Sequence, residues 1–151
     1  MTELHDVALV DFPVARYAQM QQHHDALLRE FALIATDLED SRAPRDLLRL
    51  ANEIFERYGD AAEPFREGVA AAVERGDIVT TLKLSIPNST LRWTEDFLLL
   101  FEEADEYCAR GDLLTPAAPP EVVAFRRWMV GELIRQIRDG ASPSPYWSQE
   151  L

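Results

Sequence analysis

Two adjacent histidines, His23 and His24, are the residues of this sequence whose types most readily suggest chemistry. Neutral imidazole is a common metal ligand and carries protons near neutral pH. A metal site on one helix would need further ligands three or four residues on, and those positions hold only alanine and leucine. The spacing therefore argues against a metal site. We expect His24 to be semi-buried and hydrogen-bonded within a helix pair, with His23 at the edge of the same face.

His24 also has an interpretation as a phosphotransfer residue. The segment HHDALLRE places an acidic residue directly after this histidine on a predicted helix. That arrangement is similar to the phospho-accepting histidine of two-component kinases, although the Asn/Pro pattern of that motif is missing. We keep His24 as a phospho-acceptor as an alternative to a purely structural histidine.

The second candidate is Arg126, because it falls near the middle of the apolar arc of a helix predicted at 120–139. A buried, unpaired charge costs several kcal/mol, so this arginine needs a carboxylate or several carbonyl oxygens. One interpretation is a buried ion pair that ties two helices together. The other is an anchor for an anion or for a carboxylate of a partner. In both cases we predict a buried Arg126 with an acidic partner.

Three aromatic residues near the C-terminus extend this candidate site. Trp128 is expected on the solvated side of the last helix, beside Glu132 and Arg135. The tail at 141–151 contains prolines, so we predict a strap whose aromatic side chains dock back on the domain. Trp128 is then covered by that tail or left as an interface anchor. The predicted interaction site consists of Arg126, Trp128, Tyr146 and Trp147.

The helices and strands that position these residues are predicted from the positions of proline and glycine and from the spacing of apolar residues. Prolines open the helical stretches, and Gly59, Gly76, Gly111 and Gly140 close them. The patterns predict helices at 14–36, 43–58, 62–75, 90–110 and 120–139, and strands at Val7–Phe12 and Ile78–Ile86. The predicted fold class is α-rich α+β: about five helices in a compact bundle with a small two-stranded element, in the order β-α-α-α-β-α-α.

The chain has the length of a single domain, 1–151. Residues 1–76 and 77–140 each begin with a strand that ends in an apolar-Pro step, so we interpret them as candidate half-repeats followed by a tail at 141–151. In the helix at 90–110 the aromatic residues form one arc, which we expect to be buried. The acidic residues, including Asp105, are expected on a solvated face, with Leu99 as a lone exposed leucine among them.

Composition narrows the functional classes. Fifteen basic and twenty-seven acidic residues give a net charge of −12, which disfavours binding to nucleic acid or to anionic membranes. A single cysteine, Cys108, excludes an intramolecular disulfide, and we expect it to be inert packing. We find no signal-peptide pattern and expect a cytoplasmic protein. Neither a cofactor motif nor a set of catalytic residues is present, so we predict no cofactor and no enzymatic activity.

The segments FPVARYAQMQQHHDALLREFALIA, DEYCARGDLL and PPEVVAFRRWMVGELIRQI, with a later Pro-Tyr-Trp, carry a resemblance over most of the chain. The chain resembles small actinobacterial regulatory proteins that accompany anti-sigma ATP-binding proteins, STAS-type antagonists and stage II sporulation E-type phosphatases. The resemblance implies a role in partner-switching signal transduction by protein contact, with an anti-sigma-type ATP-binding protein as the partner. It transfers no catalytic residue.

We therefore predict a non-enzymatic cytoplasmic regulatory module that binds another protein. One alternative is a histidine phosphotransfer domain that uses His24. A further alternative is a structural homodimer held by an apolar helix face.

Overall fold

The computed structural model describes residues 3–36 and 45–146. Its elements in chain order are β1 (Leu4–Pro13), α1 (Val14–Thr36), α2 (Arg45–Arg75), β2 (Val79–Pro87), α3 (Asn88–Ala109) and α4 (Pro120–Arg138). The strands form one antiparallel two-stranded sheet. The predicted α-rich α+β class is thus confirmed, and most element boundaries lie within a few residues of those expected from the sequence.

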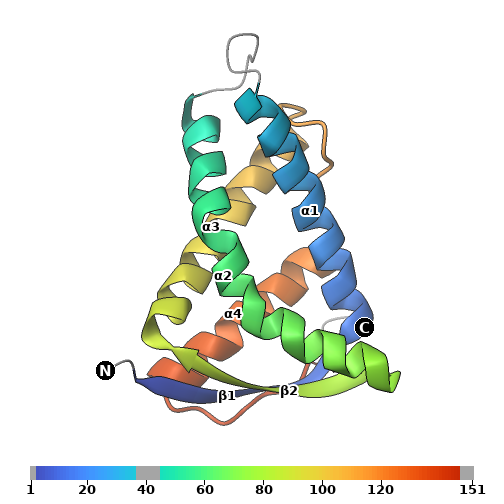
Figure 1. Cartoon of the computed structure of the whole chain (residues 1–151), viewed down its shortest axis with the longest axis vertical. Coiled ribbons are helices and arrows are strands. Elements are labelled where there is room, and N and C mark those ends of the chain that lie inside the picture. Colours follow the sequence, from blue (N-terminus) through green and yellow to red (C-terminus); the bar gives the residue numbers. More distant parts are fainter. Residues whose placement is uncertain (1–2, 37–44, 147–151) are drawn as a thin grey trace.

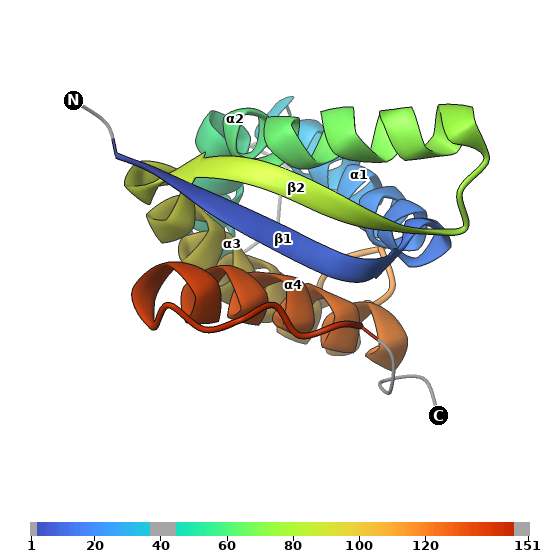
Figure 2. The same ribbon diagram turned by 90° about the horizontal axis from the view of Figure 1, so that it is seen from below.

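The sheet lies across one end of the molecule, and α1, α3 and the first half of α2 extend away from it (Figure 1). Val7 pairs with Leu84 and Leu9 with Leu82, so the apolar side chains of both strands share one face. Lys83, on the other face, is exposed. Seen from below, the strands lie between α2 and α4 (Figure 2). The alternation of apolar and polar residues in β2 therefore has its usual cause, a sheet with one buried face.

An irregularity in β1 decides which way Phe12 points. Leu9 pairs with Leu82 and Phe12 with Thr80, so β1 has one residue more than β2 between these pairs. Asp11 takes a left-handed conformation there, with φ of 57°, which aspartate tolerates better than most residues. Residues three apart in a regular strand face opposite sides. The bulge brings both Leu9 and Phe12 onto the buried face.

The segments 43–58 and 62–75, predicted as separate helices, are two arms of the single helix α2; residues 43 and 44 lie outside the described residues. The expected break at Gly59 is not present, and Pro64 lies inside the helix. Proline lacks an N–H and crowds the preceding turn, so it kinks a helix that tertiary packing keeps together. Figure 1 shows α2 changing direction near its middle.

The open edge of β1 is covered by α4 and by the strap, residues 141–146, which runs back along α4 (Figure 2). The backbone N–H of Tyr146 donates to the Val10 carbonyl at 3.1 Å. The Tyr146 side chain is 7% exposed, and its ring meets that of Phe125 edge-on with centroids 5.5 Å apart. The predicted strap is thereby confirmed for Tyr146, whereas Trp147 lies outside the described residues.

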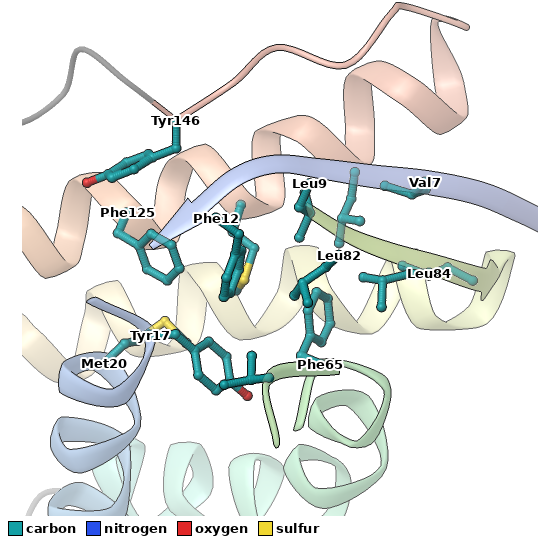
Figure 3. Packing of buried hydrophobic residues seen from close by; sticks show 14 of the residues in the cluster. Val7, Leu9, Phe12, Tyr17, Met20, Phe65, Leu82, Leu84, Phe125 and Tyr146 are labelled. Atoms are coloured by element: carbon teal, nitrogen blue, oxygen red, sulfur yellow. The ribbon is translucent and has the colours of Figure 1, made fainter. Parts of the chain in front are cut away.

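The buried side chains form two separate hydrophobic cores. The sheet-side core combines the strands, α4 and the strap with the near ends of α1, α2 and α3 (Figure 3). The helix-side core is formed by the far ends of α1, α2 and α3 with Leu113. The helices α1, α2 and α3 therefore each cross from one core to the other.

Candidate functional site

The two cores meet at a seam where buried polar side chains gather around a cavity of about 50 Å³. All four helices line it. Met20 of α1, Phe65 of α2 and Met129 of α4 come from the sheet-side core. Tyr58 and Phe97 come from the helix-side core. The bend in α2 lies at this seam, because Pro64 falls between Ala62 of one core and Phe65 of the other.

His24 begins a chain of hydrogen bonds along one wall of the seam. Its Nδ1 lies 2.9 Å from the Tyr58 hydroxyl, which donates to Gln21 Oε1 at 3.0 Å. Gln21 Nε2 in turn donates to the Tyr17 hydroxyl at 2.9 Å. Because the single Tyr58 proton is given to Gln21, Nδ1 of His24 must carry the hydrogen of the first bond. The neutral His24 ring then has an unprotonated Nε2.

His24 is 3% exposed, and its ring stacks on Phe101 with the ring centroids 3.8 Å apart. Burial lowers the pKa of His24 well below its usual value, and the nearby Arg126 and His23 lower it further. The ring is therefore neutral at physiological pH. The predicted hydrogen bond within a helix pair is confirmed, because Tyr58 belongs to α2 and His24 to α1. The ring is buried and not semi-buried as expected.

Arg126 is 3% exposed and donates from Nη2 to Asp105 Oδ2 at 3.1 Å. The predicted buried arginine with an acidic partner is confirmed. The expected solvated face is wrong for Asp105, because it lies against α4 and the loop after α3. Its Oδ1 accepts from the Ala118 N–H at 3.3 Å and lies 3.7 Å from His23 Nε2. One carboxylate thus joins α1, α3, α4 and that loop.

Three buried nitrogen atoms at the seam have no hydrogen-bond partner among the described residues. They are Nε2 of His24 and both Nε and Nη1 of Arg126. Both residues line the cavity, and both also contact the Phe101 ring, since the Arg126 guanidinium carbon lies 5.6 Å from its centroid. A buried polar group without a partner costs about 1–3 kcal/mol, and a charged one more. Within residues 3–36 and 45–146, the seam therefore combines a buried charge with several buried nitrogen atoms that have no hydrogen-bond partner.

Of the two alternatives predicted for Trp128, the structure shows the one in which the tail covers it. Its indole Nε1 donates to the Ser144 carbonyl at 3.3 Å, and its ring lies 5.0 Å from that of Tyr146. Glu132 beside it is buried. Its carboxylate accepts hydrogen bonds from the Ser144 N–H at 2.7 Å and from Arg135. The strap is what changes the environment of this face. Arg126 and Tyr146 are buried and Trp128 is covered, so the predicted set does not form an open surface.

A groove between α2 and α3, with a volume of about 260 Å³, did not emerge from the sequence. Trp93, Phe97 and Leu100 line it, and Leu99, 64% exposed, stands beside them. Arg57 of α2 lies 3.8 Å from Asp96 of α3 at its rim. The helical pattern of α3 predicted Leu99 to be an isolated exposed leucine. The sequence has no local signal for the groove, because the charged pair at its rim joins two helices whose packing is a property of the folded chain.

Cys108 is buried as expected, and burial with the nearby Asp105 and Glu30 raises the pKa of its thiol to about 12. Over the described residues, no group of three or more His, Cys, Asp or Glu side chains has the arrangement of a metal site. Within the same ranges, no helix is both long and apolar enough to cross a membrane. Comparison with family models, with curated proteins and with solved structures finds no match.

Proposed function

We propose that this protein is a non-enzymatic cytoplasmic regulatory module that binds another protein through the groove between α2 and α3. The resemblance noted in the sequence supports bacterial partner switching as its setting, with an anti-sigma-type ATP-binding protein as the partner. The observation that supports the groove is Leu99, which exposes most of its side chain next to the half-buried Trp93 and Leu100. Aromatic and aliphatic anchors of this kind contribute most of the binding energy at protein interfaces.

The groove has the chemistry to accept an amphipathic helix. Trp93, Phe97 and Leu100 supply an apolar floor between α2 and α3. The helix-in-groove mode inserts apolar side chains spaced three and four residues apart into such a floor. Glu53 and Asp96 lie on its two sides, and each has an arginine beside it, Arg49 at 3.0 Å and Arg57 at 3.8 Å. With a net charge of −12 on the whole chain, we expect the partner helix to carry basic residues beside its apolar anchors.

The test is binding of the purified anti-sigma-type ATP-binding protein from the same genome, measured by isothermal titration calorimetry. Leu99→Arg should weaken the complex at least tenfold, because an interface anchor is worth about 2 kcal/mol or more. Leu114→Arg is the matched control, because Leu114 is 94% exposed and lies outside the groove. Equal affinity of both variants and the wild type rules out the groove. The lack of any binding by the wild type rules out this partner.

The two alternatives have less support. Phosphotransfer through His24 needs a ring that a donor can reach, and this ring is buried and stacked on Phe101. A homodimer would bring together two chains that each carry a net charge of −12. Phosphorylation assays with a cognate kinase test the first alternative, and light scattering at high protein concentration tests the second.

A further inference from the structure

We propose that the open edge of β2 is a second interaction surface, at which an extended segment of a partner protein adds a third strand to the sheet. The surface is formed by Thr81, Lys83 and Ser85, and it shares no residue with the α2–α3 groove. It would take a partner segment in a different backbone conformation, a strand and not a helix.

The pairing of the strands shows which backbone groups face this edge. In an antiparallel pair, opposite residues alternate between those that bond to each other and those whose N–H and C=O both point outward. Ala8 is of the second kind, because both of its backbone groups bond to Gln136 on the open side of β1. Lys83 is the register partner of Ala8, so its backbone groups point to the open side of β2. Thr81 and Ser85, two residues away on either side, point the same way.

The backbone groups on this edge have no partner in the described part of the chain. Within residues 3–36 and 45–146, no N–H or C=O group of Thr81, Lys83 or Ser85 takes part in a hydrogen bond outside the strand pair. On β1, by contrast, Gln136 bonds to Ala8 and the Tyr146 N–H donates to the Val10 carbonyl. One edge of the sheet is thus covered and the other is open.

The helix beside β2 offers no substitute for a strand. Figure 2 shows α2 on the side of β2 away from β1. Gly68 of α2 packs closely there, since a Cβ atom on it would lie 2.9 Å from Leu82 Cδ2. Pro64 and Ala71 share this side of α2 by helical spacing, and no side chain of these three residues can form a hydrogen bond. Arg75, the next residue on this side, already donates to two other side chains.

The side chains along β2 define the chemistry of the added strand. Lys83 is exposed and forms no ion pair within the described residues, and Val79 is 50% exposed. Opposite charges, hydroxyl pairs and β-branched pairs stabilise neighbouring strands when they lie directly across from each other. We therefore expect an antiparallel segment with an acidic residue opposite Lys83, a hydroxyl residue opposite Thr81 and a β-branched residue opposite Val79. Its alternate residues lie beside the small side chains of α2.

A second copy of the chain fits this edge less well. Antiparallel pairing of two β2 strands would bring Lys83 of one copy beside Lys83 of the other, and like charges across strands are unfavourable. Lysine on a strand edge also protects against self-pairing. The same side chain thus opposes a second copy and favours an acidic partner segment.

The experiment is a titration of the ¹⁵N-labelled full chain with the peptide acetyl-Thr-Val-Glu-Val-Thr-Val-Val-amide, followed by ¹H–¹⁵N correlation spectra. We expect saturable shifts of the Thr81, Lys83 and Ser85 amides. N-methylation of the glutamate and both threonines of the peptide blocks the amides that face β2, and it should weaken binding at least tenfold. N-methylation of the first two valines, whose amides face away, is the matched control and should change the affinity little. The absence of saturable shifts at these amides, or equal weakening by both methylation patterns, overturns the proposal.

Variants of β2 test the same surface from the other side. Ser85→Pro should stay folded, because the N–H that it removes lies on the open edge, and it should lose peptide binding at least tenfold. Ser85→Ala keeps the N–H and should bind as wild type does. Lys83→Glu should weaken binding at least threefold, and a peptide with lysine in place of glutamate should restore it. Unchanged binding by Lys83→Glu would overturn the acidic preference.

Light scattering of the free chain decides between a partner and a second copy. A monomer is expected, and a dimer that Ser85→Pro abolishes would make a second copy the occupant and overturn the proposal. The β2 variants leave the α2–α3 groove intact, and Leu99→Arg leaves β2 intact, so the two interaction surfaces fail separately.

Discussion

The side-chain amide of Gln136 hydrogen-bonds to both backbone groups of Ala8. It donates from Nε2 to the Ala8 carbonyl at 2.9 Å and accepts from the Ala8 N–H at 3.0 Å. A helix side chain thereby takes the place that a neighbouring strand would occupy on the open edge of β1. Uncovered edges of this kind template pairing with other chains.

Gln136→Leu should destabilise the protein by about 1–3 kcal/mol, because two backbone groups of Ala8 lose their partners. It should also increase self-association through the freed strand edge. Urea unfolding and light scattering measure the two effects. Gln22→Leu, at an exposed position of α1, is the control and should change neither. If Gln136→Leu behaves like this control, the amide contributes nothing to covering the edge.

The Asp105–Arg126 pair is expected to behave as a buried ion pair. Asp105→Ala should cost about 3–5 kcal/mol, because it leaves the Arg126 charge buried and unpaired. The double variant Asp105→Leu/Arg126→Met should recover most of that loss, since both charges are then removed. The exposed pair Arg127–Glu102, with a 2.7 Å contact, is the control, and Glu102→Ala should cost less than about 1 kcal/mol. Similar losses for Asp105→Ala and Glu102→Ala, measured by urea unfolding, would contradict this assignment.

His24 should make folding stability depend on pH below about 6.5, its usual pKa. Its folded-state pKa is depressed by burial, so below pH 6.5 the unfolded chain binds a proton that the folded protein does not. Stability from this residue is complete above pH 6.5 and falls by up to about 1.4 kcal/mol per pH unit as the solution is acidified. His24→Phe keeps an aromatic ring beside Phe101 but cannot titrate. The difference in unfolding free energy between wild type and variant should therefore shift in favour of the variant from pH 7 to pH 5, and a constant difference would exclude the effect.

Removal of the Tyr146 ring should release the strap. Tyr146→Ala deletes the edge contact with Phe125 and uncovers Trp128, and we expect a loss of about 3–5 kcal/mol, as for other buried aromatic rings. In a background with the other tryptophans replaced by phenylalanine, the emission of Trp128 should move to longer wavelength. Tyr146→Phe retains the ring and should resemble wild type. An unshifted emission in Tyr146→Ala would show that the strap stays in place without this side chain.

Local patterns in the sequence predicted the elements well, because periodicity and caps act over a few residues. Gly76, Gly111 and Gly140 have positive φ, as expected of residues that close helices. Gly59 does not, because packing against both cores holds α2 together across Pro64. The candidate half-repeats stay a prediction.

The candidate site was predictable only in part. The apolar arc of α4 predicted burial of Arg126 and an acidic partner, but it could not identify Asp105, which the periodicity of α3 assigned to a solvated face. The same arithmetic placed Glu132 in solvent, because the strap that buries it is a contact of the folded chain. Neither the seam cavity nor the α2–α3 groove has a local signature, since each is a space between helices. Helical periodicity predicts which face of a helix is apolar, but it does not predict which segments cover the opposite face.

The bend in α2 links the two cores without a loop between them. Its first arm supplies Leu47, Leu50 and Ile54 to the helix-side core, and its second arm supplies Phe65 and Val69 to the sheet-side core. Hydrogen exchange should therefore divide this one helix into two protection classes, each following the core that its arm serves. The kink at Pro64 would then mark the boundary between two cooperative units of unfolding. The amide exchange rates of this one helix would then show whether the two ends of the molecule unfold independently.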